Sequence, residues 1–333
     1  MLGACPACPR RRQRRLRPLS GVSEKETKAT PSLVLGVLVL GLLAGAPATA
    51  HAEPELAALA PADDVREVIA LGPYGEVYAP DGKGAWVREQ PITVADRIRH
   101  AGRAGRSVVV LAGGAVYRLA PNGWTALRLA QRGTAVMSPG RDAVGAVGRM
   151  LLSLDTFERN GEPKKIVRAP HPITAIGSGK DIVIATERGL FRVQGRRVKP
   201  IRSPERVDQL VDDRWALVER GAIDLTTGKT VPWPAGVRVV VAASGPGDSL
   251  VAVADSGGSL VLVTVKGGKL TRESLPTTIT GTPVGVVVDG SGRAIVALAE
   301  GQLALRERGR WSVLTVTERL PSPRPGSAPA RLP

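Results

Sequence analysis

Carboxylates are the side chains of this sequence that could do chemistry. Seven aspartates stand at turn-like positions beside short apolar stretches: Asp142, Asp181, Asp212, Asp213, Asp248, Asp255 and Asp289. Two carboxylates at a suitable separation can act as an acid and a base in hydrolysis. Aspartate in a turn also accepts hydrogen bonds from nearby backbone N–H groups. We assign the seven aspartates to this structural role.

Other reactive side chains are scarce. Beyond residue 52 the chain has two histidines, His100 and His171, and no cysteine. Nucleophilic catalysis needs a base near a serine or cysteine. The spacings typical of zinc proteases, paired-cysteine metal sites and hydrolase nucleophile elbows do not occur. We therefore predict no catalytic, cofactor-binding or metal-binding residues and no cofactor, and we interpret His171 as a solvated loop residue.

Seven glycines mark a repeat, because each separates two short apolar stretches. They recur at intervals of 32 to 43 residues: Gly75, Gly114, Gly148, Gly189, Gly221, Gly258 and Gly301. A period near 40 residues with four strands per unit is typical of a β-propeller, in which each small sheet buries its faces against its neighbours. We expect an all-β, seven-bladed β-propeller of four-stranded antiparallel blades over residues 65–318, with six blades as the alternative.

The first and last repeats differ in completeness. The last has apolar strands over 283–289, 294–299, 303–307 and 311–316, with glycines at the reversals. The first has only three strands after residue 65, and an open sheet edge invites aggregation. Its missing innermost strand has to come from elsewhere, and Leu56–Leu59 is the candidate. Residues 53–64 are thus a linker or a closing strand.

Three tryptophans follow a turn glycine at the start of a predicted fourth strand. They are Trp86, Trp124 and Trp311. In a functional interpretation they would stack on sugars or bases. Because the fourth strand is the outermost of a blade, we interpret them instead as packing residues between blades.

The N-terminal segment is expected to be an export signal. Arginines are concentrated between residues 10 and 17, a 14-residue apolar run spans Leu33–Ala46, and small residues follow up to Ala52. We predict cleavage after Ala52 or after Ala50, so that residues 1–52 are a signal peptide with an upstream basic segment. A spanning helix needs about 20 apolar residues. We therefore expect a periplasmic or secreted bacterial protein without a permanent membrane span.

The charge balance bounds the partners. The chain has a net charge of +16, of which residues 1–52 carry eight Lys/Arg and two Asp/Glu, which leaves +10 on the remainder. Such an excess attracts anionic partners, although we expect these cations to be scattered. Aromatic residues make up 3% of the chain, so a stacking platform for nucleic acid is not expected. We expect a monomer that binds a protein or an anionic surface polymer, and a disordered Pro-rich tail over 319–333.

One repeat resembles those of known sensor proteins. The stretch from Ile173 to Val193, with Asp181-Ile182-Val183-Ile184-Ala185-Thr186 followed by Gly189-Leu190-Phe191, is similar to the propeller repeat in sensor domains of two-component regulators. In this family a Gly-Thr pair ends the strand, where this chain has Ala185-Thr186. The resemblance implies a propeller fold and transfers no active site.

A second repeat resembles a different propeller family. Ala222-Ile223-Asp224-Leu225-Thr226-Thr227-Gly228-Lys229, with Trp233 behind it, is similar to the tryptophan docking motif of quinoprotein-type propellers. The resemblance implies a structural role, in which the Asp and Thr cap a hairpin and the Trp packs on the next blade. One such copy does not imply a quinone cofactor.

These observations favour a noncatalytic function. We expect an exported binding or interaction scaffold for a protein or surface polymer, on a fold whose loops converge at one face. One alternative is a propeller hydrolase, lactonase-like or glycan-cleaving, that uses carboxylates at the central channel. The other is an envelope assembly scaffold.

Overall fold

A computed structural model describes residues 54–317, apart from 62–67, 82–84, 91–92, 121, 128–134, 141, 158–161, 204–205 and 290. All of them belong to one compact unit, His51–Pro333. The expected signal segment over 1–52 and the Pro-rich tail over 319–333 lie outside the described residues.

The described residues form 28 β-strands. Those of the first half are β1 (Ala58–Pro61), β2 (Val68–Leu71), β3 (Val77–Pro80), β4 (Trp86–Gln90), β5 (Ile98–Ala104), β6 (Ser107–Ala112), β7 (Ala115–Ala120), β8 (Gly123–Ala126), β9 (Ala135–Met137), β10 (Val144–Val147), β11 (Met150–Phe157), β12 (Pro163–Arg168), β13 (Ile173–Ser178) and β14 (Ile182–Thr186). Those of the second half are β15 (Gly189–Gln194), β16 (Arg197–Ile201), β17 (Gln209–Val211), β18 (Trp215–Val218), β19 (Gly221–Asp224), β20 (Thr230–Pro232), β21 (Val237–Gly245), β22 (Ser249–Ser256), β23 (Ser259–Lys266), β24 (Lys269–Ser274), β25 (Pro283–Val288), β26 (Ala294–Leu298), β27 (Gln302–Glu307) and β28 (Arg310–Thr317).

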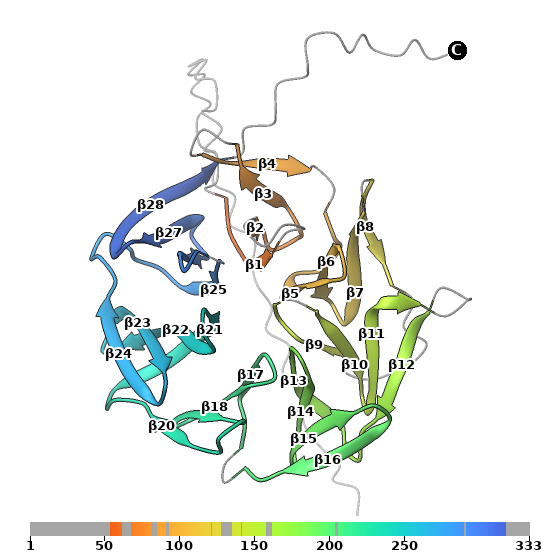
Figure 1. Ribbon diagram of the computed structural model, residues 1–333. Coiled ribbons are helices and arrows are strands. Elements are labelled where there is room, and N and C mark those ends of the chain that lie inside the picture. Colours follow the sequence, from red (N-terminus) through yellow and green to blue (C-terminus); the bar gives the residue numbers. More distant parts are fainter. Residues whose placement is uncertain are drawn as a thin grey trace, which may run out of the picture. The chain divides into compact units, whose positions relative to one another are not determined.

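The strands are arranged as a β-propeller of antiparallel blades. Five separate four-stranded sheets are formed by β5–β8, β9–β12, β13–β16, β17–β20 and β21–β24. Figure 1 shows the first strand of each group at the centre of the ring and the fourth strand at its outer edge. An all-β propeller with four-stranded antiparallel blades was expected, and this part of the prediction is confirmed.

The predicted number of blades is wrong. The remaining strands do not make separate blades but one eight-stranded sheet, in the order β1-β2-β3-β4-β28-β27-β26-β25, beside the five four-stranded blades. Its halves join where β28 pairs with β4 in parallel, with Val316 opposite Trp86 and Thr317 opposite Val87. The Thr317 hydroxyl also donates to the Trp86 carbonyl at 3.3 Å. The glycine period indicates how many hairpins the chain forms. It does not indicate which hairpins share a sheet, because that depends on pairing between two outer strand edges, each with free N–H and C=O groups.

The inner edge of the first repeat is supplied by β1. This strand runs antiparallel to β2 and pairs Ala58 with Leu71 and Pro61 with Val68. It overlaps the candidate segment Leu56–Leu59 in its first two residues. Leu56 itself is fully buried, and its N–H donates to the Ala299 carbonyl at 2.9 Å. The segment before β1 therefore ties the first repeat to the last.

The repeat glycines lie between the second and third strands or, as Gly189 and Gly221 do, at the first position of the third strand. Most have a positive φ, as at Gly114, where φ is +86°, a conformation that glycine adopts without the steric strain of a Cβ. Gly221 is required for a different reason, because a Cβ there would lie 2.5 Å from the Val231 carbonyl oxygen. One repeat pattern thus serves both backbone conformation and close strand contact.

The hydrophobic core lies between neighbouring sheets. One cluster, for example, joins Val251 and Val253 of β22 to Val296 and Leu298 of β26. Second strands such as β26 are buried along their whole length, because both of their faces are packed. This explains why they are continuous apolar runs, while outer strands such as β24 are polar and have no buried residue.

The three repeat tryptophans each contact a neighbouring repeat. Trp86 is buried in a cluster shared by the first and last repeats. The Trp124 indole N–H donates to the Gly75 carbonyl of the first repeat at 2.8 Å, and that of Trp311 donates to Glu273 at 2.8 Å. These contacts support the packing interpretation.

Candidate functional site

The central channel widens at one end into a cavity of about 560 Å³. Its wall is built by the loops that join the first strand to the second strand of successive repeats. Three aspartates and a lysine line it: Asp142, Asp212, Asp289 and Lys180. We call these four residues and their cavity the acidic mouth. The volume lies within the usual range for ligand-binding pockets.

Asp289 is committed to the fold of its own loop. Its side chain is 5% exposed. One carboxylate oxygen accepts the Ser291 N–H at 2.9 Å, the Ser291 hydroxyl at 2.6 Å and the Arg293 N–H at 3.0 Å, and the other accepts Arg293 Nε at 3.0 Å. Burial alone would raise the pKa of Asp289, but these hydrogen bonds and the Arg293 charge outweigh it and lower the pKa. The carboxylate stays ionised and is a poor general acid.

Asp212 and its neighbour link three repeats. Asp212 has a left-handed backbone with φ +47°, and its carboxylate accepts the Ser244 hydroxyl of β21. Asp213 accepts the backbone N–H of Asp181 at 2.8 Å. The Asp181 carboxylate in turn pairs with Arg192 at 3.1 Å. These aspartates hold adjacent loops together, as the turn interpretation of the sequence expects.

Asp142 and Lys180 are the uncommitted charges of the acidic mouth. Both are exposed, and Asp142 has φ +54°. Among the residues that the structure describes, neither has an ion pair or a side-chain hydrogen bond. They are therefore free to contact a partner. Lys180 was missed in the sequence, although its place in the turn just before the predicted second strand that begins at Asp181 was a usable signal.

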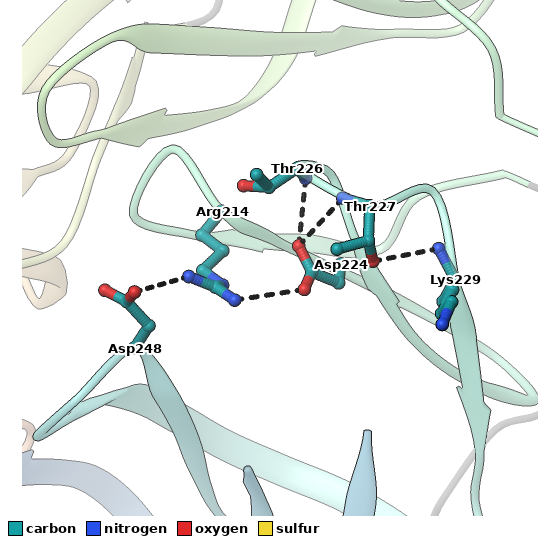
Figure 2. A network of polar contacts seen from close by, with 6 residues as sticks. All are labelled: Arg214, Asp224, Thr226, Thr227, Lys229 and Asp248. Atoms are coloured by element: carbon teal, nitrogen blue, oxygen red, sulfur yellow. Dashed lines mark hydrogen bonds and ion pairs between the residues drawn. The ribbon is translucent and has the colours of Figure 1, made fainter. Parts of the chain in front are cut away.

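The docking-motif repeat forms the polar network of Figure 2. The Asp224 carboxylate accepts the Thr226 N–H at 2.9 Å and the Thr227 N–H at 3.4 Å, and the Thr227 hydroxyl accepts the Lys229 N–H at 3.3 Å. Arg214 pairs with Asp224 at 3.1 Å and with the exposed Asp248 of the next repeat at 2.6 Å. Asp224 and Thr227 thus cap a hairpin, and Arg214 ties that hairpin to its neighbour.

Trp233 completes this motif by packing. Its indole N–H donates to the Val218 carbonyl at 3.3 Å, and its ring packs against Val237 and Val261 of the next sheet. The implied structural role of the motif is confirmed. Asp255 is also structural, because it lies near the end of β22 and accepts the Gly258 N–H at 2.8 Å.

The other end of the channel has a different lining. Here a cavity of about 480 Å³ is bordered by Arg99, His100 and Asp208 among apolar residues. We call it the opposite mouth. Desolvation by the surrounding protein, and secondarily the Arg99 charge, lower the pKa of His100, although its side chain is exposed at this open mouth. His171 is half-buried and lines neither cavity, so the structure does not bring the two histidines together.

Within the described part of the chain, no group of three or more His, Cys, Asp or Glu side chains is arranged to hold a metal ion. The same residues contain no helix with the length and hydropathy of a membrane span.

Comparison with known proteins places the chain by fold. No family model and no curated protein matches the sequence. Among solved structures, the extracellular domain of the putative hybrid two-component system BT4673 from B. thetaiotaomicron matches with a TM-score of 0.57 at 13% identity, over 77% of this chain and 38% of that chain. The chain therefore spans well under half of that sensor.

Two further structures match over nearly their whole length. A streptogramin B lyase has a TM-score of 0.58 at 12% identity, over 79% of this chain and 95% of that chain. YCF48 from Cyanidioschyzon merolae has a TM-score of 0.53 at 16% identity, over 76% of this chain and 95% of that chain. At such identities these likenesses show the fold alone. The resemblance to sensor propellers seen around Gly189 is confirmed at that level, and the chain is a β-propeller.

Proposed function

We propose that this protein is an exported interaction scaffold that binds a segment of a partner protein at the acidic mouth. The observation that carries the proposal is the pair Asp142 and Lys180, two exposed and uncommitted charges of opposite sign on one cavity. The cavity wall also includes the apolar side chains of Val211, Val286 and Val288. A segment with one basic, one acidic and one apolar side chain fits this surface.

The state of the carboxylates favours binding over catalysis. Acid and base catalysis needs carboxylates that can exchange protons near neutral pH. Asp289 is held ionised by four hydrogen bonds, and Asp212 is bound to Ser244. Only Asp142 remains for proton transfer. Two of the three aspartates that line the cavity, Asp289 and Asp212, thus hold the loops together.

Structural neighbours support a peptide-binding role. YCF48 has been solved bound to the D1 peptide, and this complex matches with a TM-score of 0.50 at 13% identity, over 82% of this chain and 95% of that chain. A propeller of this architecture is therefore able to hold a peptide.

The sequence features of residues 1–52 support export, and N-terminal sequencing of the native protein should find Glu53 or His51 at its start.

Site-specific cross-linking tests the proposal. In one version of the full chain, produced in its native cells, a photoreactive amino acid replaces Lys180. In a second version it replaces Lys269, an exposed control position that does not line the mouth. We expect a discrete protein adduct from position 180 only. Asp142→Asn should abolish that adduct, and asparagine is chosen because it tolerates the left-handed backbone. Identical adducts from both positions, or none from either, would refute the proposal.

A hydrolase is the second candidate, because three aspartates share the one cavity. The purified protein is assayed against panels of lactones and acidic glycans. Turnover that is lost in Asp142→Asn and retained in Asp248→Asn would establish the hydrolase and remove the scaffold. Absence of turnover, together with the adduct from position 180, would establish binding.

A further inference from the structure

A strip of exposed positive charge follows the outermost strand of the β13–β16 blade. It consists of Arg196, Arg197, Lys199 and Arg202, which we call the basic strip. All four side chains are exposed, and residues 196–202 contain no acidic residue. None of the four forms an ion pair with any residue that the structure describes. Their charge is therefore available to a ligand.

The strand geometry places these charges along one accessible edge. β16 pairs only with β15, so its other edge is free, and Pro200 within it is typical of an edge strand. Arg197 and Lys199 are two residues apart and share a face, with their Cα atoms about 6.6 Å apart. Ile201 shares that face and packs into the cluster that its blade forms with the next blade, so Arg197 and Lys199 lie on the side of β16 that faces the next blade.

The pairing of β16 with β15 adds a second observation. Lys199 stands directly opposite Arg192, and Arg197 stands opposite Gln194. Like charges directly opposite each other destabilise a sheet. Asp181 pairs with Arg192 and so offsets one of the two charges, but Lys199 is left without a counterion from the described residues. A bound anion at this point would remove the repulsion.

The surroundings of the strip select among anionic ligands. Single-stranded nucleic acid needs aromatic side chains on which bases stack, and β16 has none. Membrane surfaces are bound by apolar side chains beside the charges, but the exposed large hydrophobic residues of the described chain, Tyr74, Val240 and Val313, lie on other strands and loops. A long polyanion without bases or acyl chains needs neither aromatic nor apolar side chains beside the charges, so it fits the strip.

We infer that the basic strip is a binding site for an acidic polysaccharide, whose carboxylate or sulfate groups pair with Arg197 and Lys199 on one face of β16 and with Arg202 just beyond the end of the strand. The site is separate from the acidic mouth and goes beyond the proposed protein binding. Recognition rests on charge, so it is screened by salt. The scaffold thus has a peptide site at its channel and a polyanion site on its rim.

The test uses the full chain with heparin as the sulfated probe and polygalacturonate as the carboxylated probe. Their affinities are measured by calorimetry in low salt and in about 0.5 M NaCl. The strip variant is Arg197→Gln/Lys199→Gln/Arg202→Gln. Its matched control, Lys266→Gln/Lys269→Gln/Arg272→Gln, removes three exposed cations from the corresponding hairpin of another blade.

We expect the strip variant to weaken polysaccharide binding about tenfold or more, which corresponds to about 1.4 kcal/mol, and the control to weaken it less than about twofold. High salt should abolish binding. Equal losses in both variants would overturn the inference, since any surface charge would then suffice. Tighter binding to phosphatidylglycerol vesicles or to oligo-dT than to either polysaccharide would also overturn it. Asp142→Asn should leave polysaccharide binding unchanged, so a failed mouth proposal is distinguishable from a failed strip.

Discussion

At the acidic mouth three aspartates line one cavity, and Asp289 and Asp212 are bound within the loops that carry them. At the opposite mouth the charged residues Arg99 and Asp208 have no ion pair among the described residues. The difference follows from the chain segments that supply them. Loops between first and second strands have to cap themselves, whereas the starts of inner strands are already held by sheet hydrogen bonds.

The largest expected effect concerns the inner-strand contacts beneath the two mouths. A Cβ at Gly177 would overlap the Asp212 carbonyl oxygen, whereas at Gly285 of the opposite mouth the nearest atom is the Leu59 nitrogen at 2.9 Å. We expect Gly177→Ala to lower the free energy of unfolding by about 3 kcal/mol and Gly285→Ala by about 1 kcal/mol. Urea unfolding measures both. Equal losses would show that the two ends are equally tight.

The second effect separates a loop-bound aspartate from an exposed one. Asp289→Asn should cost about 2 kcal/mol, because it leaves one acceptor oxygen in place of two and removes the buried charge that strengthens these hydrogen bonds. Asp248→Asn, at 74% side-chain exposure, should cost under about 0.5 kcal/mol. The folded pKa of Asp289 lies below its ordinary value of 3.8. Its contribution is therefore present above pH 3.8 and is lost as the pH falls through the folded pKa. The gap between wild type and Asp289→Asn should close in acid.

The third effect tests the opposite mouth through His100. Its folded pKa lies below its ordinary value of 6.5, so the unfolded chain binds the proton more readily. Stability should therefore fall as the pH is lowered from 6.5 toward the folded pKa, and be unaffected above 6.5. His100→Gln should flatten this part of the pH profile in thermal unfolding. An unchanged profile would mean that desolvation and the Arg99 charge do not lower the pKa of His100.

The smallest expected effect on stability is at the free charges. Asp142→Asn should change the free energy of unfolding by less than about 0.5 kcal/mol, because its carboxylate bonds to no described residue. The same variant should lose the cross-linked adduct. A large loss of stability measured by urea unfolding would show that Asp142 is structural, like Asp289, and would erase the distinction within the acidic mouth.

The fold was predictable because its signals are local. Turn glycines, apolar strand runs and the position of Trp124 each depend on a few neighbouring residues. The joining of β4 to β28 was not predictable, since it depends on two outer edges more than 200 residues apart meeting in parallel. The turn-like position of Asp289 indicated a turn cap. It gave no sign of which capped loops would share a cavity.

The basic strip shows a similar limit. The positive charge was expected to be scattered, and along the sequence Arg196 and Arg202 do look like ordinary surface residues. Only the edge position of β16 and the pairing of Lys199 with Arg192 reveal an unbalanced charge. Strand register, which sets those neighbours, depends on tertiary packing as well as on local pattern.

The parallel seam between β28 and β4 has a consequence for how the molecule is made. Its register pairs involve Val316 and Thr317 on one side and Trp86 and Val87 on the other. During synthesis β4 emerges early, and its outer edge stays unpaired until β28, the last strand of the described chain, has been translated. In a nascent chain halted before residue 316, the outer edge of β4 therefore lacks its partner strand, and an unpaired strand edge favours pairing with another chain.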